Sequence, residues 1–545
     1  MVAASFQISG NILDPIQKRI FPGVITVTDG IITDISPVDA QFSHYITPGL
    51  IDAHLHIEST MLIPSEFARI AVTHGTVAVL ADPHEIANVL GIDGIIYMIE
   101  NAKTTPLKTY FGVPSCVPAT PYETAGAVLN NDEIERLFKD YHLAFMGEMM
   151  NYPGVISGDP EVLARLALAR KYGKPIDGHA PGLTGPDLMQ YIQAGISTDH
   201  EAYALDEALA KIEAGMKIII REGSAAKNFG DLHPLISQHP AHVMLCSDDK
   251  HPDLLIKGHL TPVVKQALQL GYTPFDLFQC TSVNPVHHYR LEVGLLQIGD
   301  PADFLIIDNF ENFTVLATYI QGTKVAENGR CLFPATKAEP INNFRIQFKK
   351  ATDFQVHSKS NHIHVIEAIP DQLITRHRVM KATKNGDLIV SDVSRDLLKI
   401  AVVNRYREQP PAIGFIQNFG LREGAIASSV AHDSHNIVVI GVDDSSIAEA
   451  VNLIIASRGG LALVSEQHRE VLSLPVAGLM STEDGYTVAA HYEKLAAIAK
   501  ELGCPHKDAF MTMSFMALLV IPELKMSDRG LFDSTRFQLI PLEAE

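Results

Sequence analysis

The sequence has few cysteines and little positive charge, and each shortage excludes a class of protein. Its five cysteines are odd in number, widely separated and never paired as CxxC; they are Cys116, Cys246, Cys280, Cys331 and Cys504. This usage fits a reducing compartment and excludes a disulfide framework. Lys and Arg total 43 against 63 Asp and Glu, so the formal net charge is −20. A surface this acidic argues against nucleic acid or an anionic membrane as the main partner.

Long hydrophobic runs are also missing. The longest, residues 515–521, is far shorter than the roughly 20 residues that a membrane-spanning helix needs. The first residues, MVAASFQISGNILDP, lack the basic start and apolar centre of a signal peptide. We therefore expect a cytoplasmic protein that has no membrane partner.

The 545 residues suffice for about three or four domains, and 46% hydrophobic with 19% charged residues is typical of globular chains. The pattern of residues 1–47 predicts short strands, and Asp29-Gly30 predicts the turn of a β-hairpin. From Pro48, strand-like runs alternate with helix-length segments. The eight runs are LIDAHLHIES, GTVAVLAD, TYFGVPSCV, LAFMGEMMN, PIDGHAP, ISTDHE, KIIIREGS and HVMLCSDD. This alternation predicts an α/β protein with a (β/α)8 TIM-type barrel; an open doubly wound sheet is the alternative on periodicity alone.

The barrel has strand-rich flanks. After Asn284-Pro285 the chain reads GLLQIGDPADFLIIDNFENFTVLATYIQGTKVAENGR, which returns to strands. We predict that residues 1–47 and 290–350 together build a small β-sandwich domain. Residues 48–289 are then the catalytic barrel, and residues 351–545 form a C-terminal α+β domain.

Most of the barrel strand candidates end in a His, Asp or Glu. In a (β/α)8 barrel these ends converge on the face where catalysis occurs. The residues are His54, His56, Asp82, His84, Glu85, Glu148, His179, His200, Asp248 and Asp249. Imidazole and carboxylate ligands without thiolate suit Zn²⁺, Mn²⁺ or Fe²⁺, and four His with two carboxylates are enough for two ions that share a bridge.

Each of these residues also has a structural reading. A single His is more often a hydrogen-bonded core residue than a ligand, and HxH alone is a weak motif. Glu148 in the apolar run FMGEMM is stronger evidence for a metal ligand, because a buried carboxylate needs a metal or a cation as partner. The set as a whole favours a metal site.

The motifs that surround these residues resemble a known family. PGLIDAHLHIES, His179, His200, Asp248 and GLLQIGDPADFLIID resemble the amidohydrolase superfamily over about residues 1–330. More narrowly, HIESTM, LADPHEIANV, GEMMNYPGV, DGHAPGL, TDHEA, REGSAAKN and CSDDK are similar to the bacterial adenine deaminases. VVNRY and FGLREGAIASSVAHDSHNIVVIG resemble the C-terminal domain of that family.

The resemblance implies a binuclear metal site and a reaction. One ion would be held by His54, His56 and Asp248, the other by His179 and His200, and Glu148 would bridge the two. Many amidohydrolases, hydantoinases and dihydroorotases among them, have a carboxylated lysine at the bridge, whereas this chain has Glu148. The implied activity is hydrolysis of adenine to hypoxanthine and ammonia, a reaction of purine salvage.

Further roles follow as hypotheses from that reaction. Asp248 would take the proton of the attacking water and pass it to the leaving amine. Glu85 would protonate ring atom N1 or hold the purine edge; alternatively it orients a ligand histidine. Asp82 and His84 would orient substrate or ligands, although Asp82 is equally consistent with a helix cap.

Two other groups of residues are each consistent with two roles. Arg221 and Ser224 in REGS would contact substrate, or Arg221 pairs with a barrel carboxylate. The cluster His432-Asp433-Ser434-His435 is interpreted as a loop or lid element rather than as a second metal site.

Alternatives remain open at this stage. A hydrolase of cyclic amides, like hydantoinases or dihydroorotases, or of another aminopurine would use the same scaffold. A binding protein that has lost its metals usually lacks several ligands, whereas all six positions are filled here. Zinc deaminases that act on flipped bases need P-C-x-x-C, which is absent. We expect two divalent ions, Mn²⁺ above Fe²⁺ or Zn²⁺, a small purine base as partner, and a homodimer as the commonest assembly.

Overall fold

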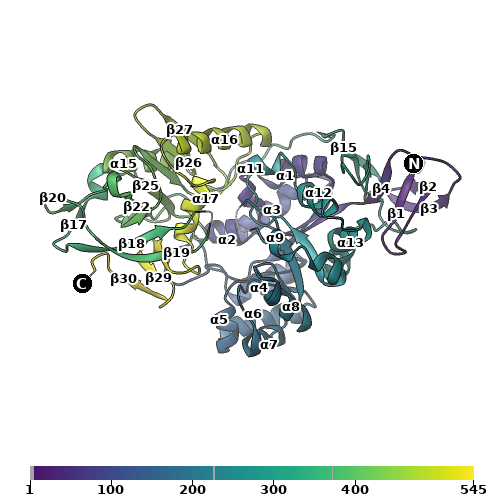
Figure 1. Cartoon of the computed structure of the whole chain (residues 1–545), viewed down its shortest axis with the longest axis horizontal. Helices are drawn as coiled ribbons and strands as arrows, with labels where there is room; N and C mark the ends of the chain where they lie inside the picture. The colour runs from purple at the N-terminus through teal and green to yellow at the C-terminus, as the bar shows by residue number, and fades with distance from the viewer. Residues whose placement is uncertain (1–4, 225–226, 371, 545) are drawn as a thin grey trace.

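The computed structural model describes residues 5–224, 227–370 and 372–544. Residues 1–4 and Glu545, at the outer ends of two predicted domains, lie outside these ranges, as do Asp371 and the two alanines of REGSAAKN, Ala225 and Ala226. Figure 1 shows three parts along the long axis: an N-terminal sheet, a central barrel and a C-terminal part. Among the described residues, no helix is both long enough and apolar enough to cross a membrane.

The central part is a barrel of eight parallel strands. They are β5 (Leu50–Leu55), β6 (Thr76–Ala81), β7 (Lys108–Val113), β8 (Phe145–Met149), β9 (Ile176–Gly178), β10 (Thr198–Asp199), β11 (Lys217–Arg221) and β12 (Val243–Cys246). β5 to β9 and β10 to β12 pair in chain order. The Ser197 N–H donates to Ile176 O at 3.0 Å next to β9 and β10, and a parallel bridge from Leu55 to Asp248 closes the ring.

Burial explains why these apolar runs become barrel strands. Every residue of β5, β6, β8 and β12 is buried, as expected for parallel strands covered on both faces. All eight predicted strands are present, and the prediction of a TIM-type barrel is confirmed.

Helices connect and surround the barrel strands. They are α1 (Pro64–Ala71), α2 (His84–Leu90), α3 (Ile92–Ala102), α4 (Asn131–Asp140), α5 (Tyr152–Ser157), α6 (Pro160–Lys171), α7 (Gly185–Gln193), α8 (Leu205–Glu213), α9 (Phe229–Leu232), α10 (Leu235–Gln238), α11 (Pro252–Leu255), α12 (Thr261–Gln269), α13 (Pro274–Phe278) and α14 (Asn284–Tyr289). α4 begins with a capping box between Asn130 and Glu133.

The N-terminal sheet combines strands from both flanks of the barrel. Its order is β16-β15-β14-β13-β4-β1-β2-β3. The strands are β1 (Ser5–Asp14), β2 (Arg19–Thr28), β3 (Ile31–Pro37), β4 (Tyr45–Pro48), β13 (Phe304–Ile307), β14 (Val315–Ile320), β15 (Thr323–Glu327) and β16 (Arg330–Cys331). The predicted hairpin joins β2 to β3, and positive φ at both Asp29 and Gly30 fits its two-residue turn. Phe6 of β1 stacks on Tyr319 of β14, so the single sheet packs against itself.

The C-terminal part has a second eight-stranded sheet, in the order β19-β18-β23-β22-β25-β24-β26-β27. These strands are β18 (His362–Ala368), β19 (Thr375–Lys381), β22 (Leu397–Val403), β23 (Ala412–Gln417), β24 (Ala425–Ser428), β25 (Ile437–Gly441), β26 (Gly460–Val464) and β27 (Arg469–Ser473). Two smaller sheets hold β17 (Val356–His357), β20 (Lys384–Asn385) and β21 (Leu388–Ile389), and β28 (Leu524–Ser527), β29 (Gly530–Asp533) and β30 (Gln538–Ile540).

The α-helices described in this part are α15 (Asp444–Ser457), α16 (Gly485–Glu501) and α17 (Ala509–Ser514). α15 covers one face of the large sheet with Ile447 and Ile454. Residues of the other face share one continuous apolar core with the barrel. At Gly485 an added Cβ would lie 2.5 Å from Ile70 Cδ1, so α16 packs closely on α1.

The boundaries of the three predicted domains themselves stay a prediction.

Candidate functional site

The predicted metal ligands converge at the carboxyl end of the barrel strands. His54 lies in β5 and His56 directly follows it; Glu148 lies in β8; His179, His200 and Asp248 follow β9, β10 and β12. The side chains of five of the six are at most 4% exposed, and His179 is 16% exposed. Strand polarity therefore brings residues from distant parts of the chain into one cluster.

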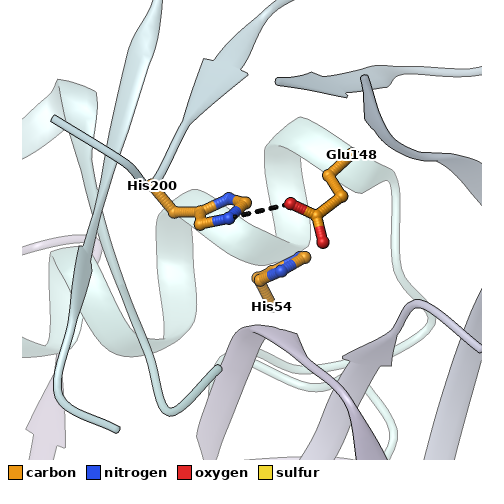
Figure 2. A group of neighbouring side chains, drawn as sticks. All are labelled: His54, Glu148 and His200. Atoms are coloured by element: carbon orange, nitrogen blue, oxygen red, sulfur yellow. Dashed lines mark ion pairs between the residues drawn. The ribbon is translucent and has the colours of Figure 1, made fainter. Parts of the chain in front are cut away.

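Glu148 is the centre of the cluster. Its Oε1 lies 3.2 Å from His56 Nε2, and its Oε2 lies 3.1 Å from His200 Nε2 and 2.5 Å from His179 Nδ1. Figure 2 shows His200 pointing at this carboxylate, with the ring of His54 facing the same space. Burial raises the pKa of Glu148, yet the surrounding histidines, His179 first, hold it well below its usual range.

Asp248 forms the second carboxylate of the cluster. Its Oδ1 lies 3.2 Å from His56 Nε2 and 3.5 Å from His54 Nε2, while Arg221 Nη1 donates to Oδ2 at 2.5 Å. Its backbone has φ 49°, in the left-handed region that Asp tolerates better than most residues. The Asp248 N–H donates to His54 O at 3.0 Å and fixes this turn against β5.

The cluster fits divalent cations. Within the described ranges, neither ring nitrogen of His54 has a hydrogen bond, and His200 Nδ1 has none either, although all three atoms are buried. Buried polar atoms without partners are uncommon in native proteins and call for a ligand. Donor atoms of His54, His56 and Asp248 lie within 4.8 Å of one another, as do those of His54, Glu148 and His200. Imidazole with carboxylate suits Mn²⁺, Fe²⁺ or Zn²⁺.

Asp82, which directly follows β6, supports the cluster. Its Oδ2 accepts the Glu148 N–H at 2.9 Å, and its carbonyl oxygen lies 3.0 Å from His56 Nδ1. Gly147 makes this approach possible, because an added Cβ there would lie 2.1 Å from Asp82 Oδ2. His84 Nδ1 lies 3.6 Å from both Asp82 Oδ2 and Glu148 Oε1, so His84 borders the same cluster.

Glu85 is turned toward the C-terminal part. One of its carboxylate oxygens pairs with His432 Nδ1 and the other with His435 Nε2. Burial raises the pKa of Glu85, but His432 and then His435 hold it well below its usual range. Glu85 therefore stays ionised in this arrangement.

Arg221 and Ser224 take different positions. Arg221 lines the cavity and donates to both Glu201 and Asp248, so it pairs with barrel carboxylates. Ser224 Oγ accepts the His251 N–H at 2.8 Å, and Ser224 is not among the residues that line the cavity.

A cavity lies over the cluster, between the barrel and the C-terminal part. The barrel contributes His56, His84, Glu85, Glu148, Met150, His179, His200, Glu201, Arg221, Asp248 and Asp249, and the C-terminal part contributes Leu373, His432, Asp433, Phe515, Leu518 and Ile521. The sequence did not identify Glu201 or the apolar wall of Phe515, Leu518 and Ile521 as cavity residues. Glu201 directly follows His200, which is the only sequence signal for it.

A (β/α)8 barrel with a His and carboxylate cluster at its carboxyl end defines a metal-dependent hydrolase of the amidohydrolase type. The amidohydrolase family model matches residues 45–325, and the model of the adenine deaminase C-terminal domain matches residues 372–538. The chain belongs to the adenine deaminase family.

Curated relatives match over nearly the whole chain. An adenine deaminase of Sulfurovum sp. is 51% identical over 98% of this chain and 99% of its own. One of Methanosarcina mazei is 50% identical over the same shares, and one of Salinibacter ruber is 48% identical over the same shares. Among solved structures, a beta-aspartyl dipeptidase of Fervidobacterium islandicum covers 61% of this chain and all of its own, with 14% identity and a TM-score of 0.47.

Proposed function

We propose that this protein hydrolyses adenine to hypoxanthine and ammonia. The observation that carries the proposal is the similarity to adenine deaminases at about half identity along 98% of the chain, both domain models included. The cavity suits a small aromatic base, because one wall holds polar barrel residues and the other holds Phe515 and Leu518.

Two divalent cations fit the cluster in a defined assignment. His54, His56 and Asp248 would hold one ion, His179 and His200 the other, and Glu148 would bridge them. The orphaned nitrogens of His54 and His200 and the central place of Glu148 support this assignment. Bound divalent ions lower the pKa of water and so supply a nucleophile near neutral pH. Mn²⁺ is the proposed ion, with Fe²⁺ or Zn²⁺ accepted by the same donors.

Asp248 is the proposed general base and acid. It takes the proton of the water that attacks C6 and delivers it to the departing amine. Arg221 fixes Oδ2 of Asp248, so Oδ1 is the oxygen that faces the histidines and the reacting atoms. Arg221 thus positions the base rather than the substrate.

The remaining predicted residues orient the site. Asp82 holds the backbone of Glu148 and the ring of His56, and His84 lies between Asp82, Glu85 and Glu148. Glu85 lines the cavity as an ionised carboxylate. Ser224 supports the loop after β12 through His251.

The proposal is tested with protein stripped of metal and reloaded with Mn²⁺. Ammonia release is measured with adenine, and with adenosine and hydantoin in parallel. We expect turnover of adenine that depends on about two equivalents of metal. Turnover of hydantoin without turnover of adenine would replace the proposal with a cyclic-amide hydrolase.

We also propose a cytoplasmic homodimer that binds neither nucleic acid nor membrane. The net charge of −20 and the unpaired cysteines support the setting, and the dimer follows from its prevalence among oligomers. Light scattering after gel filtration tests the dimer, because a mass near 59.5 kDa would indicate a monomer.

A further inference from the structure

A loop of the C-terminal part reaches into the active site. It lies between β24 and β25 and carries His432 and His435, which are 5% and 1% exposed. Tyr406 Oη donates to Ser434 O at 2.6 Å, and Asn436 Nδ2 donates to Thr124 O of the barrel at 2.8 Å. The loop is therefore held by both parts of the molecule.

Hydrogen bonding fixes the tautomer of His435. The Ala431 N–H donates to His435 Nδ1 at 3.2 Å, so the lone pair of that nitrogen is occupied. The ring proton then sits on Nε2, which donates to Glu85 Oε2. Burial, together with the charges of His432 and Arg405, lowers the pKa of His435 to about 4, which keeps the ring neutral.

This tautomer argues against a metal ion at the cluster. Donor atoms of Glu85, His432 and His435 lie within 4.8 Å of one another, a spacing that a metal would accept. A metal ligand needs the lone pair of Nε2, however, and in His435 that nitrogen carries the proton. The cluster instead holds one carboxylate between two N–H donors.

The two ring nitrogens of His432 have different surroundings. Its Nδ1–H donates to Glu85 Oε1, and its ring stacks on Phe515 with the centroids 5.0 Å apart and 15° between the planes. Within the described part of the chain, no hydrogen bond occupies Nε2 of His432, and this side chain lines the cavity. Burial lowers the pKa of His432 and Glu85 raises it, with a net value of about 9, so Nε2 carries a proton at neutral pH.

We propose that His432 is a substrate-contacting residue whose Nε2–H donates to a ring nitrogen of the purine, and that Glu85 acts through His432 as a positioning residue. The inference rests on the proposed adenine deamination. Both oxygens of Glu85 accept hydrogen bonds, so Glu85 has no proton to give to the ring. Because a nucleophile that attacks C6 pushes charge onto the ring nitrogens, a donor at this edge stabilises the transition state.

The first test is His432→Phe in the full-length enzyme loaded with Mn²⁺. Phenylalanine keeps an aromatic ring against Phe515 but removes both N–H groups. We expect kcat/KM for adenine to fall about 10- to 100-fold, the range of one hydrogen bond to a charged group. Metal content should stay unchanged, whereas the thermal midpoint should fall, because Glu85 loses one partner of a buried ion pair. A kcat/KM within twofold of wild type, or loss of metal, would overturn the inference.

Adenine analogues identify the contact. Inhibition constants are measured for 1-deaza-, 3-deaza- and 7-deazaadenine, each of which replaces one ring nitrogen by CH. Wild type should bind one analogue about 10- to 100-fold more weakly than the others, and His432→Phe should lose that discrimination. Identical discrimination in the two proteins would contradict a contact from His432.

A double-mutant cycle tests the role of Glu85. If Glu85 acts through His432, the double mutant that carries Glu85→Gln and His432→Phe should have the same kcat/KM for adenine as His432→Phe alone. If the losses of kcat/KM in the two single mutants multiply in the double mutant, Glu85 acts independently of His432, which would contradict the inference. His364→Phe, in β18 and outside the cavity, is the control and should keep wild-type kinetics. Failure of wild type to release ammonia from adenine would refute the proposed function instead, so the two failures are distinguishable.

Discussion

Lys525 in β28 is a fully buried cation whose hydrogen-bond partners, among the residues that the structure describes, are carbonyls and not carboxylates. Its Nζ donates to Leu373 O at 2.6 Å and to Phe515 O at 3.0 Å, and both of these residues line the cavity. Burial lowers the pKa of Lys525 from 10.5 to about 7. The ammonium thus holds two cavity segments in place at a cost in stability.

The magnitude follows from the pKa. At about 1.4 kcal/mol per pKa unit, the charge destabilises the fold by about 5 kcal/mol below pH 7, where both states are protonated. Above pH 7 the folded state releases the proton while the unfolded state keeps it, so stability rises with pH. At pH 9 about 2 kcal/mol of the cost remains, and none remains above 10.5.

The perturbation is Lys525→Met, which keeps chain length and removes the charge. The mutation also leaves the carbonyls of Leu373 and Phe515 without a donor, which offsets part of the gain in stability. This loss of stability is the same at every pH. We therefore expect the change in unfolding free energy on mutation to be about 3 kcal/mol more favourable at pH 6 than at pH 9. Urea unfolding is followed by circular dichroism, since the chain has no tryptophan.

A surface lysine provides the control. Lys494→Met removes an ammonium that is 55% exposed and paired with Glu470, and its effect should not differ between the two pH values. An equal effect of Lys525→Met at pH 6 and pH 9 would refute the reasoning, because it would mean that the buried amine is not titrating in this range.

Three further predictions concern the metal cluster. Asp248→Asn should lower kcat for adenine about 100- to 10,000-fold with secondary structure retained, and a near-normal rate in a steady-state assay would remove Asp248 from the chemistry. Glu148→Gln should lower the metal content below two equivalents by elemental analysis, since it removes the charge shared by three histidines. Gly147→Ala should reduce metal affinity about 10- to 100-fold in a competition titration, because the new methyl group displaces Asp82; unchanged affinity would show that Asp82 has room to move.

The barrel was predictable because its strands are buried on both faces. The run TVAVLA of β6 has no charged residue, and its counterpart in β8 has only Glu148. The predicted ends of the strands were less accurate: of ISTDHE, only Thr198–Asp199 forms a strand. The convergence of the His and carboxylate residues was predictable for a related reason, since these residues sit where barrel strands stop; their role as metal ligands stays a prediction.

The wall that the C-terminal part adds to the cavity was not predictable. Glu85 and His432 are 347 positions apart, and no periodicity or spacing links them. The HDSH cluster is visible in the sequence, but its chemistry depends on the Ala431 N–H that sets the tautomer of His435. Phe515 and Leu518 read as ordinary core residues, because an apolar side chain that lines a cavity has the same sequence signal as one that fills a core.

The distance along the chain between the metal ligands and the His432 loop has a consequence for biosynthesis. The last proposed metal ligand is Asp248, whereas the loop that completes the cavity comes about 190 residues later; at about 5 to 20 residues per second, roughly 10 to 40 s of translation separate them. The nascent chain thus contains all six proposed metal ligands long before His432 is synthesised. The cavity acquires its second wall only after the C-terminal sheet has folded and docked on the barrel.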